Sequence, residues 1–201
     1  MTAIDLKKVY RDHYQAADEP ELVDVPPRPH LMIDGMGSPG VAQEYIDAVG
    51  ALYPIAYGIR KAIKDATGDA YTVMPLQGLW WADDMDAFTA ADRDAWKWTL
   101  MICQPDVVDA ALAAAQIEEV TAKKRLASGH LVRFDHFGDG HAAQVMHHGP
   151  YSAEAPTIAR LHDFIEESGL QLTGKHHEIY LSDPRKVAPE RMRTIIRQPV
   201  K

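Results

Sequence analysis

The chain has 201 residues, 46% of them hydrophobic and 25% charged, and a formal net charge of −8 at pH 7. This composition is typical of a soluble globular protein. The negative charge argues against a general binder of nucleic acid or anionic membranes, which would need a basic face. The single cysteine, Cys103, excludes an internal disulfide framework and a cysteine zinc site. No apolar run is long enough to span a membrane and residues 1–8 lack the apolar core of a signal peptide, so we expect a cytoplasmic protein.

The first half of the chain predicts a strand, a helix and two further strands after a polar arm. We expect these elements at residues 1–27 (arm), 30–34 (strand), 43–67 (helix), 71–81 (strand) and 96–103 (strand). The helix is indicated by apolar residues that recur every three or four positions and by Gly68, which follows it as a stop. The acidic loop 83–94 between the last two strands is interpreted as a solvated lid.

The second half repeats this order after a connector helix. We expect elements at residues 106–127 (connector helix), 131–137 and 142–148 (strands), 154–168 (amphipathic helix), 176–181 and 192–197 (strands). The sequence Gly138-Asp-Gly140 predicts a hairpin between the first two of these strands. Gly169 is expected to end the amphipathic helix.

The two halves share a short signature that predicts an internal repeat. MIDG (residues 32–35) and MHHG (146–149) are each followed by a helix and two strands. The predicted fold class is therefore α+β, with two pseudo-twofold-related β-α-β-β units, at about residues 28–104 and 130–200, within one domain over 28–201. Their antiparallel sheets would surround a central ligand cleft.

All four tryptophans fall within nineteen residues, at Trp80, Trp81, Trp96 and Trp98. Such a cluster can line a slot for a flat organic molecule, but it can equally be ordinary core or a dimer contact. Trp96 and Trp98 have the same strand parity, whereas the adjacent Trp80 and Trp81 point to opposite faces. At most three of the four indoles are therefore expected to share one face.

Glu178 lies in the strand sequence HHEIY (residues 176–180) and is the main candidate for chemistry. By period two, His176, Glu178 and Tyr180 share one face, which we expect to line the cleft. His177, Ile179 and Leu181 are expected to face the helices. A carboxylate in a partly apolar cleft should have a raised pKa, and it could hold a cation or act as a general base. The alternative is an edge-strand glutamate exposed to solvent.

No metal or cofactor is expected. The pairs His147-His148 and His176-His177 each project to opposite faces of a strand, so neither pair can chelate one ion. No phosphate-binding or dinucleotide glycine pattern and no nucleophile elbow occurs. Cys103, in the middle of an apolar strand, is interpreted as a small core residue.

Several motifs spread along the chain resemble those of stand-alone GyrI-like small-molecule-binding proteins. They are LVDVPP (22–27), LMIDG (31–35), PLQGLWW (75–81), WKWTLMI (96–102), HGPY (148–151), HHEIYLSDPR (176–185) and TIIRQPV (194–200). The resemblance implies a β-α-β-β pair around an aromatic cleft. It also implies a functional carboxylate at Glu178, with Tyr180 and Tyr151 near it. We expect the ligand-binding residues to be Trp80, Trp81, Trp96, Trp98, Gln77, Tyr71, Met146, His148, Tyr53 and Tyr57.

One position departs from the pattern of the family. Relatives commonly carry glutamate where this chain has Gln77. A glutamine keeps the shape and the hydrogen bonding of the side chain, but it can neither take a proton nor offset a positive charge. A function that needs a second carboxylate there would be lost in this chain.

Two functions follow from the resemblance, and a third is structural. Stand-alone relatives include hydrolases that open the cyclopropane of DNA-alkylating natural products, and other relatives bind aromatic or cationic drugs without catalysis. We expect a small-molecule ligand, no nucleic-acid or membrane partner, and a monomer or homodimer. Some regulatory relatives carry a DNA-binding domain, but only a short arm precedes residue 28 here, so we do not expect a transcription factor. A homodimer with tryptophans in its interface is the third alternative.

Overall fold

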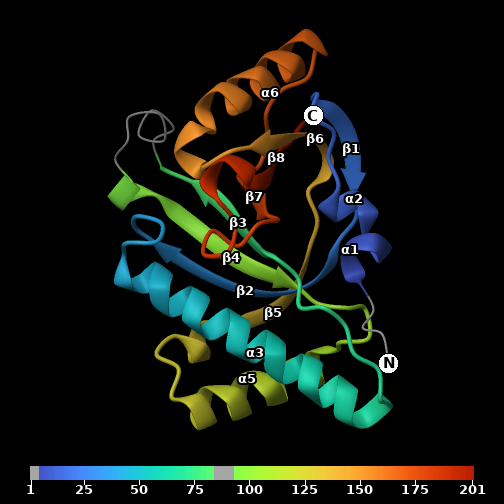
Figure 1. Cartoon of the computed structure of the whole chain (residues 1–201), viewed down its shortest axis with the longest axis vertical. Helices are drawn as coiled ribbons and strands as arrows, with labels where there is room; N and C mark the ends of the chain where they lie inside the picture. The colour runs from blue at the N-terminus through green and yellow to red at the C-terminus, as the bar shows by residue number, and fades with distance from the viewer. Residues whose placement is uncertain (1–4, 84–92) are drawn as a thin grey trace. The chain divides into compact units, whose positions relative to one another are not determined.

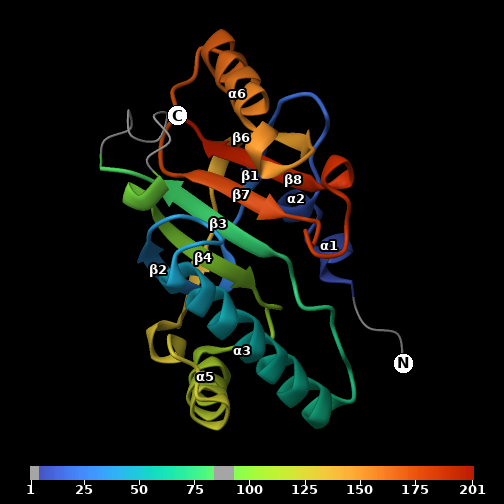
Figure 2. The same ribbon diagram turned by 60° about the vertical axis from the view of Figure 1, so that its left-hand side comes forward.

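The computed structural model describes residues 5–83 and 93–201, so most of the acidic loop that we interpreted as a lid lies outside the described residues. These residues form two compact units (Figures 1 and 2). Unit 1 comprises residues 28–74, 80–83 and 93–137, together with residues 5 and 6. Unit 2 comprises residues 7–27, 75–79 and 138–201.

Unit 1 is an antiparallel sheet with two helices. Its elements are β2 (Arg28–Met36), α3 (Gln43–Thr67), the end of β3 (Leu76–Trp81), the short helix η1 (Arg93–Ala95), β4 (Lys97–Cys103), α5 (Ala110–Lys124), η2 (Gly129–Leu131) and β5 (Arg133–Phe137). The strand order is β3-β4-β2-β5. Helix α3 packs against β2 and β4, and α5 packs against α3 (Figure 1). The predicted helix 43–67 is confirmed, because its apolar positions form the buried face.

Unit 2 has the same kind of architecture. Its elements are α1 (Leu6–Val9), α2 (Arg11–Tyr14), β1 (Glu21–Val25), the start of β3, β6 (Gly140–His148), η3 (Tyr151–Ala153), α6 (Ala155–Glu167), β7 (His176–Tyr180), η4 (Pro189–Arg191) and β8 (Arg193–Pro199). The strand order is β1-β6-β8-β7-β3 (Figure 2). Helix α6 packs on β6. The core beneath it consists of Ala143, Val145, Leu161, Ile165, Ile196 and Val200.

The expected internal repeat is confirmed by the order and pairing of the strands. Both β2-α3-β3-β4 and β6-α6-β7-β8 are β-α-β-β runs. In each run the last strand lies between the other two, giving the orders β2-β4-β3 and β6-β8-β7. The strands are antiparallel in the pairs β2·β4, β6·β8 and β7·β8. The fold class is therefore α+β, as the sequence indicated.

The expected hairpin at Gly138-Asp-Gly140 is wrong. Strand β5 pairs with β2, whereas β6 pairs with β1 and β8. Asp139 is not an exposed turn residue, because its carboxylate is 1% exposed and forms an ion pair with Arg197. Gly138 crosses the Pro26-Pro27 segment so closely that a Cβ atom on it would lie 2.6 Å from the Pro26 carbonyl carbon. Residues 138–140 therefore connect two strands that pair with other strands.

Gly138→Ala should therefore lower the free energy of unfolding by about 1–3 kcal/mol, because backbone atoms of Pro26 must move to admit the methyl group. The matched control is Gly50→Ala in α3, where nothing lies within 4 Å of the added Cβ. That variant should be as stable as the parent, or more stable by about 1 kcal/mol. Urea unfolding measures both changes, and a neutral effect at Gly138 would contradict the crossing.

Other boundaries differ from the sequence expectation. Strand β3 begins at Leu76 rather than at residue 71, directly after Pro75, which cannot donate to a strand ladder. The expected arm contains α1, α2 and β1. Cys103 is fully buried in β4, which confirms that it is a core residue. Within residues 5–83 and 93–201, no helix is both long and apolar enough to cross a membrane.

Candidate functional site

In unit 1, Tyr45 of α3 and three tryptophans form a connected group of aromatic rings. The Tyr45 ring stacks on Trp80 at a centroid distance of 6.3 Å and contacts Trp98 edge-on at 5.7 Å. Trp96 contacts Trp80 edge-on at 5.9 Å. Trp81, the other member of the adjacent pair, is half-buried. This arrangement follows the strand parity, with Trp80 joining Trp96 and Trp98.

Trp98 itself is a core residue. Its side chain is fully buried, and its indole N–H donates to the Gly37 carbonyl at 3.2 Å. A Cβ atom at Gly35 would overlap the indole ring, so the glycine leaves the space that the ring fills. Trp98 therefore packs against Tyr45 as part of the core. The rings of Trp81 and Trp96 are half-buried and are the more accessible indoles of the group.

The remaining predicted residues of unit 1 lie on separate elements. Tyr71 is buried and its hydroxyl donates to Gln104 Oε1 at 3.4 Å. Burial raises the pKa of the Tyr71 phenol well above its ordinary value. Tyr53 and Tyr57 both lie on α3, the first half-buried and the second 57% exposed.

In unit 2, Glu178 lies on the face of the sheet that α6 covers. Directly opposed residues of antiparallel strands place their side chains on the same face. Glu178 is opposite Ile196, which belongs to the core beneath α6. His177 is opposite Arg197 and therefore lies on the other face. The expectation that His177 and Ile179 would face the helices is thus wrong for α6.

The Glu178 carboxylate is held by two side chains of its own strand. His176 Nε2 lies 3.2 Å from Oε1, and the Tyr180 hydroxyl donates to Oε2 at 2.7 Å. The ring of Tyr151 meets Tyr180 edge-on at 5.3 Å. The side chains of Glu178 and His176 are only 13% and 5% exposed, whereas Tyr151 is 38% exposed. The structure thus brings together the three residues for which we predicted chemistry.

The pKa of Glu178 is shifted in the opposite direction from our expectation. Burial by itself raises the pKa of this carboxyl group, because it penalises the charged form. The hydrogen bonds from His176 and Tyr180 and the electrostatic interaction with His176 act the other way. Their combined effect is larger, so the pKa of Glu178 lies below its ordinary value and the side chain is a carboxylate at neutral pH.

Two further histidines and a threonine lie on the α6 side of this sheet. His147 of β6 contacts Thr157 Oγ1 at 2.9 Å and the Pro150 carbonyl at 3.3 Å. Burial lowers the pKa values of His147 and of His162, the latter on α6. Thr194, fully buried opposite His147, has no hydrogen-bond partner for its hydroxyl among the described residues. Among residues 5–83 and 93–201, no three acidic, histidine or cysteine side chains are arranged to hold a metal ion.

The opposite face of unit 2 carries a buried ionic network. Asp139 accepts hydrogen bonds from His177 Nδ1 at 2.9 Å and from Arg197 Nη1 at 3.1 Å. Arg197 also donates to Gln144 Oε1 at 2.7 Å. Burial by itself raises the pKa of Asp139, but His177 and Arg197 outweigh it and hold that pKa far below its ordinary value. All three charged or titratable side chains are at most 2% exposed.

Gln77 belongs to this network. Its side-chain oxygen lies 3.0 Å from His177 Nε2, and its amide donates to the Tyr14 hydroxyl at 2.7 Å. The glutamine that departs from the family pattern therefore contacts His177 and not Glu178. Met146 lies on the same face, opposite Ile195 of β8.

His148 is at the end of β6 and pairs with Asp18 at 2.8 Å. Sequence reasoning missed Asp139 and Arg197, because only the fold brings them together. The alternation of side chains along the strand placed His176 on the same face as Glu178, and this shared face was the signal that the two residues could interact. We nevertheless assigned His176 no role from the sequence.

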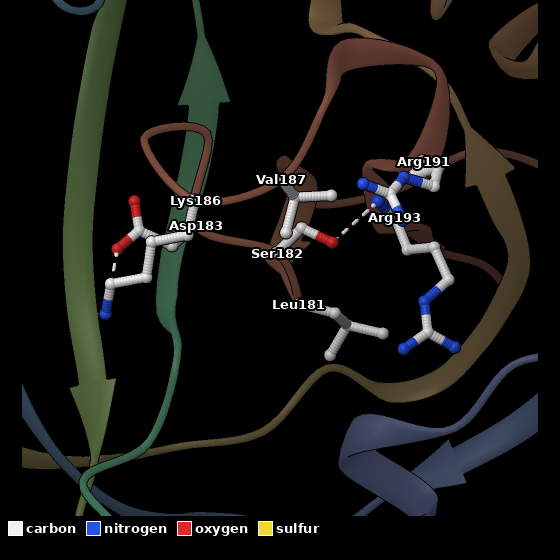
Figure 3. Close-up of a pocket in the computed structure, with 7 residues that line it drawn as sticks. All are labelled: Leu181, Ser182, Asp183, Lys186, Val187, Arg191 and Arg193. Carbon is white, nitrogen blue, oxygen red and sulfur yellow. Dashed lines mark hydrogen bonds and ion pairs between the residues drawn. The ribbon is translucent and has the colours of Figure 1, made fainter.

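A surface hollow is lined by residues that follow the C-terminal end of β7 and by residues at and before the start of β8 (Figure 3). Its lining consists of Leu181, Ser182, Asp183, Lys186, Val187, Arg191 and Arg193. Asp183 pairs with Arg185 at 3.0 Å and with Lys186 at 3.6 Å, which holds its pKa far below the ordinary value. None of the site residues predicted from the sequence lines this hollow.

Comparison with known proteins places the chain in a family. The model of the GyrI-like small molecule binding domain matches residues 18–201. A conserved protein from Listeria innocua is 41% identical, with 98% of this chain and 100% of that chain covered and a TM-score of 0.88. A second Listeria innocua protein, described as a hydrolase, is 40% identical over 98% and 100% of the two chains, with a TM-score of 0.85. A search of curated proteins finds no significant match.

A more distant structure shares only the fold. The C-terminal domain of EcmrR is 15% identical, with 91% of this chain and 97% of that chain covered and a TM-score of 0.59. The family match spans nearly the whole chain, and the two Listeria structures agree with it in fold and length. The protein belongs to the GyrI-like small-molecule-binding family.

Proposed function

We propose that the protein binds flat aromatic, amphipathic or cationic small molecules at the site formed by Glu178, Tyr180 and Tyr151. The observation that carries this proposal is a carboxyl group, 13% exposed, beside two tyrosine rings, one of them open to solvent. Membership of a small-molecule-binding family supports it. A buried carboxylate attracts a cation more strongly than an exposed one, since water screens it less. Tyrosine rings add stacking and cation–π attraction.

We further propose that water addition to a strained cyclopropane is a second function of this site. The support is the description of Listeria relatives at 40% and 38% identity as hydrolases. The oxygen of a water molecule would attack a cyclopropane carbon while the bond between that carbon and the ring carbon conjugated with a carbonyl group breaks. The electron pair of that bond would move to a conjugated carbonyl oxygen, which would accept a proton from Tyr180 or Tyr151. Glu178 would take the proton of the water. Such a reaction would protect a cell against cyclopropanoid DNA-alkylating compounds.

Product analysis separates binding from catalysis. The protein is incubated with an excess of a cyclopropane-containing alkylator and the water adduct is followed by mass spectrometry. More than one adduct per protein, lost in Glu178→Gln and kept in the exposed α6 control Glu166→Gln, is the result expected for the enzyme. Saturable binding without adduct would leave the binding function and remove the catalytic one. Absence of both would contradict the proposal.

A further inference from the structure

Glu178 has a histidine as a direct partner. His176 Nε2 lies 3.2 Å from Glu178 Oε1, and the two side chains are 5% and 13% exposed. Histidine is the side chain whose ordinary titration falls between pH 5 and 8. In the protonated form, His176 is a counter-ion for the carboxylate. In the neutral form it donates a hydrogen bond but leaves the negative charge of Glu178 uncompensated.

The other titratable groups near His176 and Glu178 differ from His176 in their contacts or in their burial. The hydroxyl of Tyr180, from β7, donates a hydrogen bond to Glu178. His162 on α6 interacts with His176, and His147 on β6 interacts with Glu178, but the pKa values of both are lowered by burial. His177 points to the opposite face and is held by Asp139. His176 is thus the imidazole that directly contacts the carboxylate.

We infer that His176 sets which ligand charge the site selects. A protonated His176 competes with a cationic ligand for Glu178, so a cation must displace the proton of His176 in order to bind. A neutral aromatic ligand does not compete for that charge and binds irrespective of the state of His176. This inference rests on the proposed binding function and adds a specificity-determining residue to it.

The test compares two probes of the same shape, the permanent cation 1-methylquinolinium and the neutral 1-methylnaphthalene, by calorimetric titration between pH 5.5 and 8. Loss of one proton on binding changes the affinity by at most tenfold per pH unit. We therefore expect the Kd of the cation to fall as the pH rises over this range, by at most about tenfold per pH unit, with release of protons on binding. The Kd of the neutral probe should stay constant.

The variant His176→Gln keeps a donor for Glu178 but cannot be charged, so the Kd of the cation should no longer depend on pH. Unchanged binding of 1-methylnaphthalene shows that the site of this variant is intact. The exposed control His141→Gln should keep the full pH dependence. A pH-independent cation affinity in the parent protein, or a pH dependence that survives His176→Gln or is lost in His162→Gln, would overturn the inference and leave the binding function standing. If neither probe binds at any pH, both are refuted.

Discussion

Glu178→Gln weakens the binding of an aromatic cation by about 30-fold or more, because removal of one partner of a buried charge pair costs about 2–5 kcal/mol. Glutamine has the same shape, so Tyr180 keeps a hydrogen-bond acceptor, and the loss reports the charge. The affinity for a neutral ligand of the same shape should change little. Calorimetric titration of 1-methylquinolinium and 1-methylnaphthalene at pH 7.5 measures both effects.

The matched control for this prediction is Glu166→Gln, which removes an exposed carboxylate from α6. It should leave both affinities unchanged. An equal loss for the charged and the neutral probe in Glu178→Gln would show that the substitution damages the site and not its charge. No loss for either probe would move the ligand away from Glu178.

The second large effect is on stability. Asp139→Asn should lower the free energy of unfolding by about 3–5 kcal/mol, because it leaves the Arg197 guanidinium buried without a counter-charge. Urea unfolding at pH 7 measures the change. The control Asp24→Asn breaks an exposed pair with His141, in which Asp24 is 87% exposed, and should change stability by less than about 0.5 kcal/mol.

The pH dependence of unfolding checks the same ion pair. The pKa of Asp139 is far below its ordinary value in the folded state, so at acidic pH the unfolded chain takes up a proton that the folded chain does not. The contribution of Asp139 is therefore complete above about pH 4, the ordinary range of an aspartate, and is lost as the pH falls below it. Asp139→Asn should flatten this acid limb. A stability profile identical to that of the parent would show that Asp139 is not ionised in the folded protein.

The order of the elements could be predicted because it depends on local patterns. Apolar spacing in α3 and α6 identified the helices, and the two runs of strand, helix, strand and strand followed from it. The pairing of β1 with β6 and of β5 with β2 could not be predicted in this way. The sequence pattern of a strand indicates which of its residues are buried, but it does not indicate which other strand pairs with it. The hairpin signal at Gly138-Asp-Gly140 was therefore misleading, since Asp139 is needed as a buried anion.

The candidate site was predicted in part for the same reason. Parity along one strand correctly joined Glu178 to Tyr180, and family resemblance added Tyr151. The alternation of side chains along a strand does not show which face a helix covers. In the structure both His176 and His177 are buried, so both faces of this strand are covered. The direction of the Glu178 pKa shift depends on donors whose geometry only the fold provides. Gln77 likewise acquired its contact with His177 from a distant strand.

Chemical-shift mapping of 1-methylquinolinium on isotope-labelled protein tests most directly whether Glu178 marks the ligand site. We expect the largest changes at Tyr151, His176, Glu178 and Tyr180, and we expect them to disappear in Glu178→Gln. Changes confined to the hollow lined by Leu181 and Arg193 (Figure 3), with Glu178 and Tyr180 unaffected, would contradict it.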